Sequence, residues 1–269
     1  MAGHEAQCDR RRAARQVFET TGSTYDPRVP LDAIKEWSLV CGGLVAHSDG
    51  VLDGEECERL MSVLELADDL ESEEYAKWVA TVSDPARLQQ LFDTLPLPPA
   101  DHHRELLEQA WVMAVADGRR TEEEIAMLDR IATRFGVEPV QLEFWRDAWT
   151  LAEAELAATV AQSLGAVLGG GSRPDDDDRP AIEEALWRTP CEAEDRERLV
   201  AVAMDEHSLD EATRAVLALP RPRRLVALRR LLEAARASKA PQAALGRVRE
   251  LAGRIDVPAA TLRRWLESA

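Results

Sequence analysis

The sequence has few aromatic residues and no segment with the alternating pattern of a β-strand pair. Aromatic residues make up 5% of the 269 residues, and β-branched residues are scattered among Ala, Leu, Glu and Arg. This composition favours helices, because β-sheets are built mainly from aromatic and β-branched residues. Apolar residues recur at every third or fourth position, which is the spacing of amphipathic helices. We therefore expect an all-α protein.

Positive charge is also in short supply. The chain holds 50 acidic and 33 basic side chains, for a net charge of −17. Contacts with phosphate groups need an excess of Lys and Arg, so the acidic part is not expected to bind nucleic acid. No apolar run approaches the roughly 18 residues of a membrane helix, and the first residues lack the apolar core of a secretory signal. Four cysteines without C-x-x-C spacing favour reduced thiols. These features predict a cytoplasmic protein without a membrane span.

The negative charge is confined to one part of the chain. Residues 1–170 hold 15 basic and 32 acidic side chains, whereas residues 171–269 hold 18 of each. The change coincides with three glycines followed by Ser-Arg-Pro and four aspartates, Asp175 to Asp178, which is the composition of a flexible, solvated linker. The predicted organisation is an N-terminal arm (1–30), a helical domain (31–168), a linker (169–180) and a second helical domain (181–269).

Apolar spacing and capping signals predict the helices of the first domain. Ser83-Asp84-Pro85 is typical of a helix start, since Asp is a good N-cap and proline is tolerated in the first turn. Gly136 is a suitable residue for a helix end. The expected helices cover 32–46, 54–67, a short segment around 75–79, a segment from Pro85, 98–116, 121–135, and a last one from Pro139 that can extend to Leu168.

Two of the predicted turns share one sequence pattern. Residues 46–56 and residues 114–124 each place Asp-Gly after an apolar helix and a Glu seven positions after the Asp. The glycines, Gly50 and Gly118, suit the positive φ at which many helices end. The pattern therefore predicts two helix–turn–helix units.

The residues that follow each Asp-Gly are typical of helix caps. Asp53 and Thr121 are the expected N-caps, and the Glu three positions after each is expected to complete a capping box. Capping alone does not require the aspartates of the two Asp-Gly pairs. The acidic side chains that the two turns offer together are Asp49, Asp53, Glu56, Asp117 and Glu124.

The paired turns resemble those of the tellurite-resistance TerB family, over about residues 32–147. The family's mark is two helix–turn–helix units, each with Ala-Asp-Gly, then an acidic or hydroxyl residue, then Glu. The second unit here, from Ala116-Asp117-Gly118 to Glu124, is very similar to it, whereas the first has Ser48 where the family favours Ala. The resemblance implies a scaffold that brings the two acidic turns together as a surface for divalent cations. It implies no catalytic residues, so a non-enzymatic module of stress-response or tellurite-resistance type is expected.

The five acidic residues suit Ca²⁺ or another divalent cation, which prefers carboxylate and carbonyl oxygens. They do not form an EF-hand, because Val51 and Leu60 stand at the third and twelfth loop positions. Ligands would have to come from both turns. The competing interpretation is a solvated acidic face whose glutamates only cap helices.

The C-terminal region resembles a degenerate copy of the first domain. When residues 247–265 are aligned with 127–145, identical residues coincide at five positions and the apolar stripe is kept. The second Asp-Gly turn is replaced by 237–240, Ala-Ser-Lys-Ala, and residues 205–210 are interpreted as a remnant of the first turn. An internal duplication is favoured over the chance similarity of amphipathic helices. The acidic site would then be lost from the second copy.

Basic side chains are concentrated near the C-terminus. We expect them to form a face that docks on the acidic first domain or on another anionic partner. Two functions therefore stay open: a cation-binding TerB-like module, or an adaptor whose acidic and basic faces dock protein partners without any metal. The arginines of the basic face are Arg221, Arg223, Arg224, Arg229, Arg230 and Arg236.

Overall fold

The structure is a computed structural model that describes residues 33–50, 52, 54–65 and 72–267. Within these ranges it consists of helices and contains no strand, which confirms the all-α prediction. The predicted arm, 1–30, lies outside the described residues. The first helices are α2 (Ala33–Ala46), α3 (Gly54–Glu65), α4 (Ser72–Val82), α5 (Pro85–Thr94), α6 (His103–Met113), α7 (Glu122–Arg134) and α8 (Pro139–Gly169). The later helices are α9 (Arg179–Trp187), α10 (Ala193–Ala203), α11 (Leu209–Ala218), α12 (Arg221–Ala237), α13 (Pro241–Arg254) and α14 (Ala259–Glu267).

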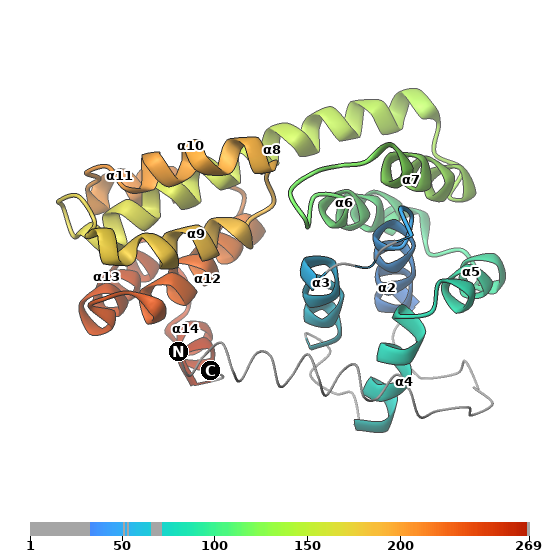
Figure 1. Ribbon diagram of the computed structural model, residues 1–269, viewed down its shortest axis with the longest axis horizontal. Helices are drawn as coiled ribbons and strands as arrows, with labels where there is room; N and C mark the ends of the chain where they lie inside the picture. Colours follow the sequence, from blue (N-terminus) through green and yellow to red (C-terminus); the bar gives the residue numbers. More distant parts are fainter. Residues whose placement is uncertain (1–32, 51, 53, 66–71, 268–269) are drawn as a thin grey trace.

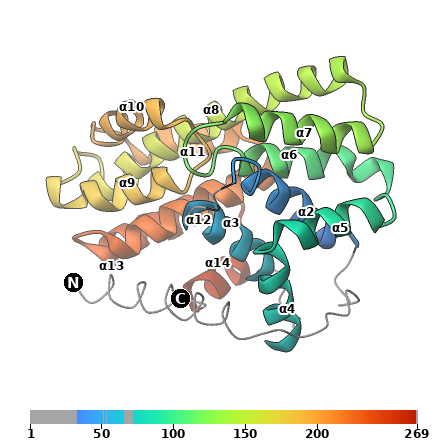
Figure 2. The same cartoon turned by 45° about the vertical axis from the view of Figure 1, so that its right-hand side comes forward.

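The helices pack around two hydrophobic cores (Figures 1 and 2). In the first core, α2 is central and contacts each of α3 to α7. Its large buried side chains include Trp37, Trp78 and Leu88. In the second core, the C-terminal part of α8 is central and contacts α9 to α13. Each core is therefore assembled around one buried helix.

The long helix α8 contributes to both cores. Leu142 and Trp149 belong to the first core, whereas the buried apolar residues from Leu156 to Leu168 belong to the second. The predicted first domain, 31–168, therefore includes a segment that packs with the second half of the chain. Helical periodicity shows that a segment is buried on one side, but it does not show which partner covers that side. Independent folding of the two halves stays a prediction.

The predicted linker, 169–180, is mostly exposed to solvent, and it also forms a turn with defined hydrogen bonds. Helix α8 ends at Gly169, and Gly170 adopts the left-handed conformation (φ 62°) that often terminates a helix. Asp176–Asp178 form a 3₁₀ turn directly before α9. Asp178 is buried and accepts a hydrogen bond from the backbone N–H of Lys239 at 2.7 Å. Lys239, which is distant in sequence, thus holds part of a segment that was predicted from its composition to be flexible.

Local signals located most helix ends correctly. The side chain of Asp84 accepts hydrogen bonds from the N–H groups of Ala86 and Arg87, as the predicted start at Pro85 requires. The segment 98–116 differs from the expected single helix. It begins with a 3₁₀ turn, Ala100–His102, and the α-helix covers only His103–Met113.

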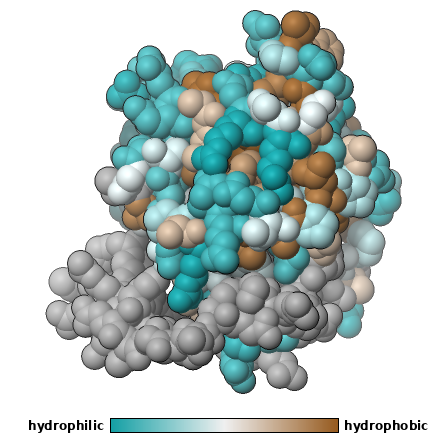
Figure 3. All heavy atoms as spheres, turned by 90° about the vertical axis from the view of Figure 1, so that its right-hand side faces the viewer, coloured by the Kyte–Doolittle hydropathy of each residue, from teal (hydrophilic) through white to brown (hydrophobic). Residues whose placement is uncertain are grey.

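One helix, α8, is long and apolar enough to cross a membrane, although no such run was expected from the sequence. Within the structure, 67% of its apolar window is buried, as in the core helix of a globular fold. Its N-terminal part is more open, since Val140 and Phe144 are 78% and 70% exposed. Figure 3 shows the face of the molecule that lies on the right-hand side of Figure 1. On this face, hydrophilic side chains surround small apolar patches.

Candidate functional site

The second Asp-Gly turn connects α6 to α7 with well-defined local contacts. Gly118 has φ 92°, which an L-residue with a side chain rarely adopts. The side chain of Asp117 accepts a hydrogen bond from the N–H of Arg119 at 2.9 Å. Thr121 and Glu124 form the predicted capping box, in which the N–H of Thr121 donates to Glu124 Oε2 at 2.6 Å. Local hydrogen bonds therefore hold Asp117, before α7, and Glu124, in the first turn of α7.

We predict that Thr121→Ala lowers the free energy of unfolding by about 1 kcal/mol, the usual value of an N-cap. The hydroxyl of Thr121 accepts a hydrogen bond from the N–H of Glu124, and alanine leaves that N–H without its partner. Urea denaturation measures the loss. An unchanged midpoint would show that α7 begins at another residue.

The first Asp-Gly turn follows α2. The N–H of Gly50 donates to the carbonyl of His47 at 3.1 Å, and Gly50 has the predicted positive φ of 86°. Ser48 donates its hydroxyl proton to the carbonyl of Val45. Asp49 is exposed, whereas Glu56 in the first turn of α3 is buried. Asp53, the predicted N-cap, lies outside the described residues.

The two turns follow helices that pack together. Helix α2 contacts α3, α6 and α7, and these helices lie side by side in Figure 1. Arg59 of α3 donates a hydrogen bond to the carbonyl of Val112 in the last turn of α6 at 2.9 Å. The helix that follows the first turn is therefore tied to the helix that precedes the second turn.

Charges from both turns act on Glu124. The pKa of this carboxyl is raised to about 7, chiefly by burial. Hydrogen bonds from Thr121 oppose the rise, and the negative charges of Asp117 and Asp49 add smaller contributions to it. Such an effect requires that the two aspartates and Glu124 lie in one neighbourhood. The structure thus brings together Asp49, Asp117 and Glu124, which the sequence separates by up to 75 positions.

The predicted cation site is not formed in full among the described residues. In the ranges that the structure covers, no three His, Cys, Asp or Glu side chains are grouped so as to hold a metal ion. Glu56 and Glu124 stand at equivalent positions in the first turns of α3 and α7, and both are buried. Carboxylate oxygens from both turns are the donors that Ca²⁺ and Mg²⁺ prefer. Their chemistry fits a divalent cation, and cation binding stays a prediction.

The six arginines of the predicted basic face have different environments. Arg223 pairs with Glu108 of α6 at 2.9 Å, which is a contact of the predicted kind between the basic and acidic parts of the chain. The other guanidinium groups of α12 mostly contact the second half itself. Arg224 donates to the carbonyls of Leu217 and Leu219, Arg236 donates to the carbonyl of Trp265, and Arg229 and Arg230 pair with Glu233.

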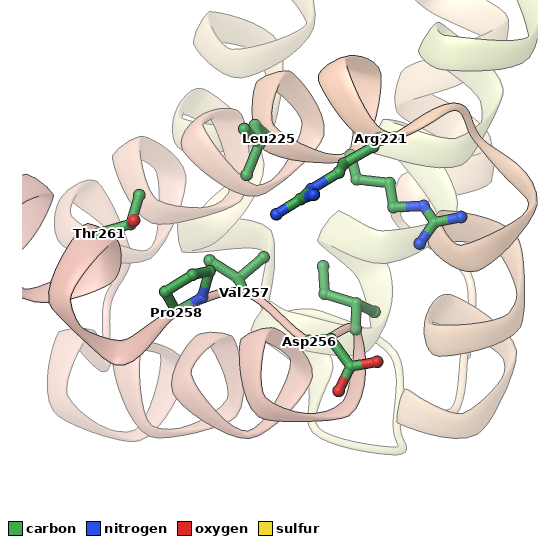
Figure 4. Close-up of a pocket in the computed structure, with 8 residues that line it drawn as sticks. Arg221, Leu225, Asp256, Val257, Pro258 and Thr261 are labelled. Carbon is green, nitrogen blue, oxygen red and sulfur yellow. The ribbon is translucent and has the colours of Figure 1, made fainter.

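Arg221 lies at the edge of a pocket of about 390 Å³ in the second half. Val257 and Pro258 lie across from it, and Asp256 is close to the same opening (Figure 4). The pocket is formed by the start of α12 and the connection between α13 and α14. It is not part of the paired turns, whose residues come from the first half.

A buried charged contact next to the second turn was not predicted. Arg120 donates hydrogen bonds to Glu153 of α8 at 2.6 Å and to Glu192, before α10, at 2.9 Å. The side chains of Arg120 and Glu153 are only 7% and 9% exposed. Arg120 also stacks over the ring of Trp111, 4.0 Å from its centroid. The second turn is therefore tied to α8 by a buried ion pair, and to the residue before α10 by a second ion pair whose carboxylate is partly exposed.

Gly118 takes part in the same anchor. Its carbonyl accepts a hydrogen bond from the N–H of Ala193 at 2.7 Å, and a Cβ at this position would lie 2.7 Å from Arg196 Nη1. One sequence signal could have indicated this contact. Glu153 interrupts the buried stripe of α8 between Trp149 and Leu156, and a charge at such a position usually has a buried partner.

Comparison with known proteins agrees with the resemblance of the paired turns. Residues 38–147 match the family model described as tellurite resistance protein TerB. No curated protein and no solved structure matches the chain. The matched range runs from α2 to the N-terminal part of α8 and includes both Asp-Gly turns. This part of the chain is therefore a TerB domain, of tellurite-resistance type.

Proposed function

We propose that the TerB domain is a non-enzymatic stress-response module whose two Asp-Gly turns bind one divalent cation, such as Ca²⁺, between them. The observation that carries the proposal is the packing of α2 with α3, α6 and α7, which brings the two turns near each other although they are distant in sequence. The charges of Asp49 and Asp117 both act on Glu124, in agreement with this arrangement. Like charges in one neighbourhood repel one another, and a cation placed between them removes that repulsion.

The residues around the proposed site suit this role. Asp117 is held by the N–H of Arg119, and Glu124 is held by Thr121, so both carboxylates are positioned before any cation arrives. Glu124 has a pKa of about 7, which means that a cation and a proton compete for it near neutral pH. Calcium binding should therefore be stronger at pH 8 than at pH 6.

The proposal predicts that Ca²⁺ stabilises the native protein. At a free concentration ten times the dissociation constant, the melting temperature should rise by about 2–5 °C. The variant Asp49→Asn/Asp117→Asn should lose most of this rise. Asparagine keeps an oxygen that can accept the Arg119 hydrogen bond, so the turn is preserved while its charge is removed. Differential scanning calorimetry with and without Ca²⁺ measures both effects.

A matched control removes the same charge elsewhere. Glu143 and Glu155 are exposed on α8, and Glu143→Gln/Glu155→Gln should respond to Ca²⁺ as the wild type does. An equal response of the wild type and the Asp49→Asn/Asp117→Asn variant would contradict the cation site. It would favour the adaptor function, in which the acidic face docks a protein partner without metal.

A further inference from the structure

The two halves of the chain have the same order of helix contacts. In the first half, the central helix α2 contacts the five helices that follow it, and the last of these, α7, contacts α8. In the second half, α8 contacts the five helices that follow it, and the last of these, α13, contacts α14. The long helix α8 thus ends one set of seven helices and begins the other.

The connections between the last helices agree in detail. The N–H of Val137 donates to the carbonyl of Ala132 at 2.9 Å, and the N–H of Val257 donates to the carbonyl of Ala252 at 3.1 Å. The residues just before the two valines, Gly136 and Asp256, have φ values of 72° and 56°. Asp256 is the only non-glycine residue with positive φ in the described ranges. The same helix ending therefore occurs in both halves, even where the sequence no longer provides glycine.

The central helices also share a close contact. A Cβ at Gly43 of α2 would lie 2.7 Å from Leu88 of α5, and a Cβ at Gly165 of α8 would lie 2.6 Å from His207, which precedes α11. By helix order, α11 corresponds to α5. Near the end of each central helix, a glycine thus allows close approach of a side chain from the corresponding region of its half.

This correspondence identifies the turns of the second half that match the Asp-Gly turns. The α8–α9 turn, with Asp175, Asp177 and Asp178, corresponds to the first turn, and the α12–α13 turn, with Lys239, corresponds to the second. The segment 205–210, interpreted from the sequence as a remnant of the first turn, instead covers the α10–α11 connection and the start of α11. The acidic run 175–178 therefore occupies the place of an acidic turn.

The side chain of Lys239 connects these two turns by ion pairs. Lys239 Nζ lies 2.9 Å from a carboxylate oxygen of Asp175 and 2.9 Å from one of Asp177. The N–H of the same lysine donates to Asp178 Oδ1 at 2.7 Å. One residue of the α12–α13 turn thus contacts three carboxylates of the α8–α9 turn.

We propose that the second half is a TerB-like copy in which the ammonium group of Lys239 takes the place of a divalent cation between the two turns. The ammonium supplies a permanent positive charge, and it covers the oxygens that a metal ion would need. Contact with Lys239 keeps the pKa of Asp175 low, so the carboxylate stays ionised around it. Removing the ammonium would leave at least two carboxylate oxygens directed at one point, and Ca²⁺ binds such oxygens at about 2.3–2.6 Å.

The test is Lys239→Met in the Asp49→Asn/Asp117→Asn background, which removes the proposed site of the first half. With Ca²⁺ at about ten times its dissociation constant, the melting temperature of this variant should rise by about 2–5 °C. Lys239→Arg in the same background retains the positive charge and should show no rise. Adding Asp175→Asn/Asp177→Asn to the Lys239→Met variant should abolish the rise.

Two results would overturn the proposal. The first is a Lys239→Met variant that is folded by circular dichroism but does not respond to Ca²⁺; if it does not fold, Lys239→Gln takes its place. The second result concerns proteins that keep Lys239. It would be a rise in melting temperature with Ca²⁺ in the Asp49→Asn/Asp117→Asn variant that is lost when Asp175→Asn/Asp177→Asn is added, because the carboxylates would then bind Ca²⁺ in the presence of the ammonium group. Every protein in this comparison carries Asp49→Asn/Asp117→Asn and therefore lacks the proposed cation site of the first half. If the wild-type protein does not bind Ca²⁺ at that site, the result of this test is not changed.

Discussion

Replacing Arg120 by leucine is expected to lower the free energy of unfolding by about 3–5 kcal/mol, which is the typical effect of breaking a buried ion pair from one side. The guanidinium of Arg120 contacts Glu153, Glu192 and the carbonyl of Trp111. Leucine fills part of the volume but provides no charge and no donor. Urea denaturation followed by circular dichroism measures the loss.

The size of the effect follows from the environment of Glu153. Burial raises the pKa of this carboxyl, and Arg120 is the main group that opposes the rise. Without Arg120, Glu153 must either stay ionised without its closest partner or take up a proton, and both destabilise the native state at neutral pH. The contact also links the α6–α7 turn to α8 and to the start of α10, so its loss should loosen the second Asp-Gly turn.

Two variants serve as controls for Arg120→Leu. Arg198 pairs with Asp195 on the surface, with side chains 68% and 49% exposed, and Arg198→Leu should cost less than about 1 kcal/mol. In Arg120→Leu/Glu153→Leu both charges are absent, and much of the stability should return. A loss in Arg120→Leu as small as that in Arg198→Leu would show that water reaches the Arg120–Glu153 pair.

Replacing Glu124 by glutamine is expected to remove a large pH dependence of stability. Relative to the wild type, the variant should gain about 3 kcal/mol between pH 4.5 and pH 8, because the pKa of Glu124 lies about 2.5 units above its ordinary value. Glutamine still provides an oxygen for the capping box, so α7 keeps its N-terminus. Urea denaturation at a series of pH values measures the gain.

The sign follows from the two pKa values. Below pH 4.5 the carboxyl of Glu124 is protonated in both the folded and the unfolded chain, and its contribution to stability is complete. Between pH 4.5 and 7 the unfolded chain ionises first, so stability is lost as the pH rises. Above pH 7 the penalty is constant. Glutamine does not ionise and carries no such penalty.

The second capping box provides a matched control of opposite sign. Glu211 stands at the same position relative to Ser208 as Glu124 does to Thr121, but it is only partly buried, and its pKa is lowered by hydrogen bonds from Ser208. Its contribution is present above its unfolded pKa and is lost as the pH falls. Glu211→Gln should therefore be less stable than the wild type at neutral pH. If Glu124→Gln and the wild type lose stability in parallel from pH 4.5 to 8, Glu124 does not have a raised pKa.

Features that depend on neighbouring residues could be predicted from the sequence. The capping box of Thr121 and Glu124, the cap at Asp84 and the positive φ of Gly118 each involve residues within a few positions of one another. Helical periodicity likewise located α2 and α7 to within two residues. The paired acidic turns were visible as a repeated pattern, and the family match covers both of them.

The role of α8 could not be predicted in the same way. Its sequence is apolar along most of its length, which predicts burial without indicating the partner. The change from the first core to the second occurs between Trp149 and Leu156, and no glycine or proline lies between these two residues to mark a boundary. The glycines at 169–171 mark the end of the helix. The domain boundary predicted from the sequence falls at these glycines, whereas the change of core lies further towards the N-terminus.

The positions of most helices, their caps, the acidic character of the two turns and the family match of residues 38–147 could all be read from the amino-acid sequence. These follow from propensity, periodicity and hydrogen bonds between near neighbours, which act within a single segment. The ion pair between Arg120 and Glu153, and the one between Lys239 and Asp175, which are 64 positions apart, can be seen only in the tertiary structure. Charge pairs of this kind have no fixed spacing in the chain, because their distance depends on how separate helices pack.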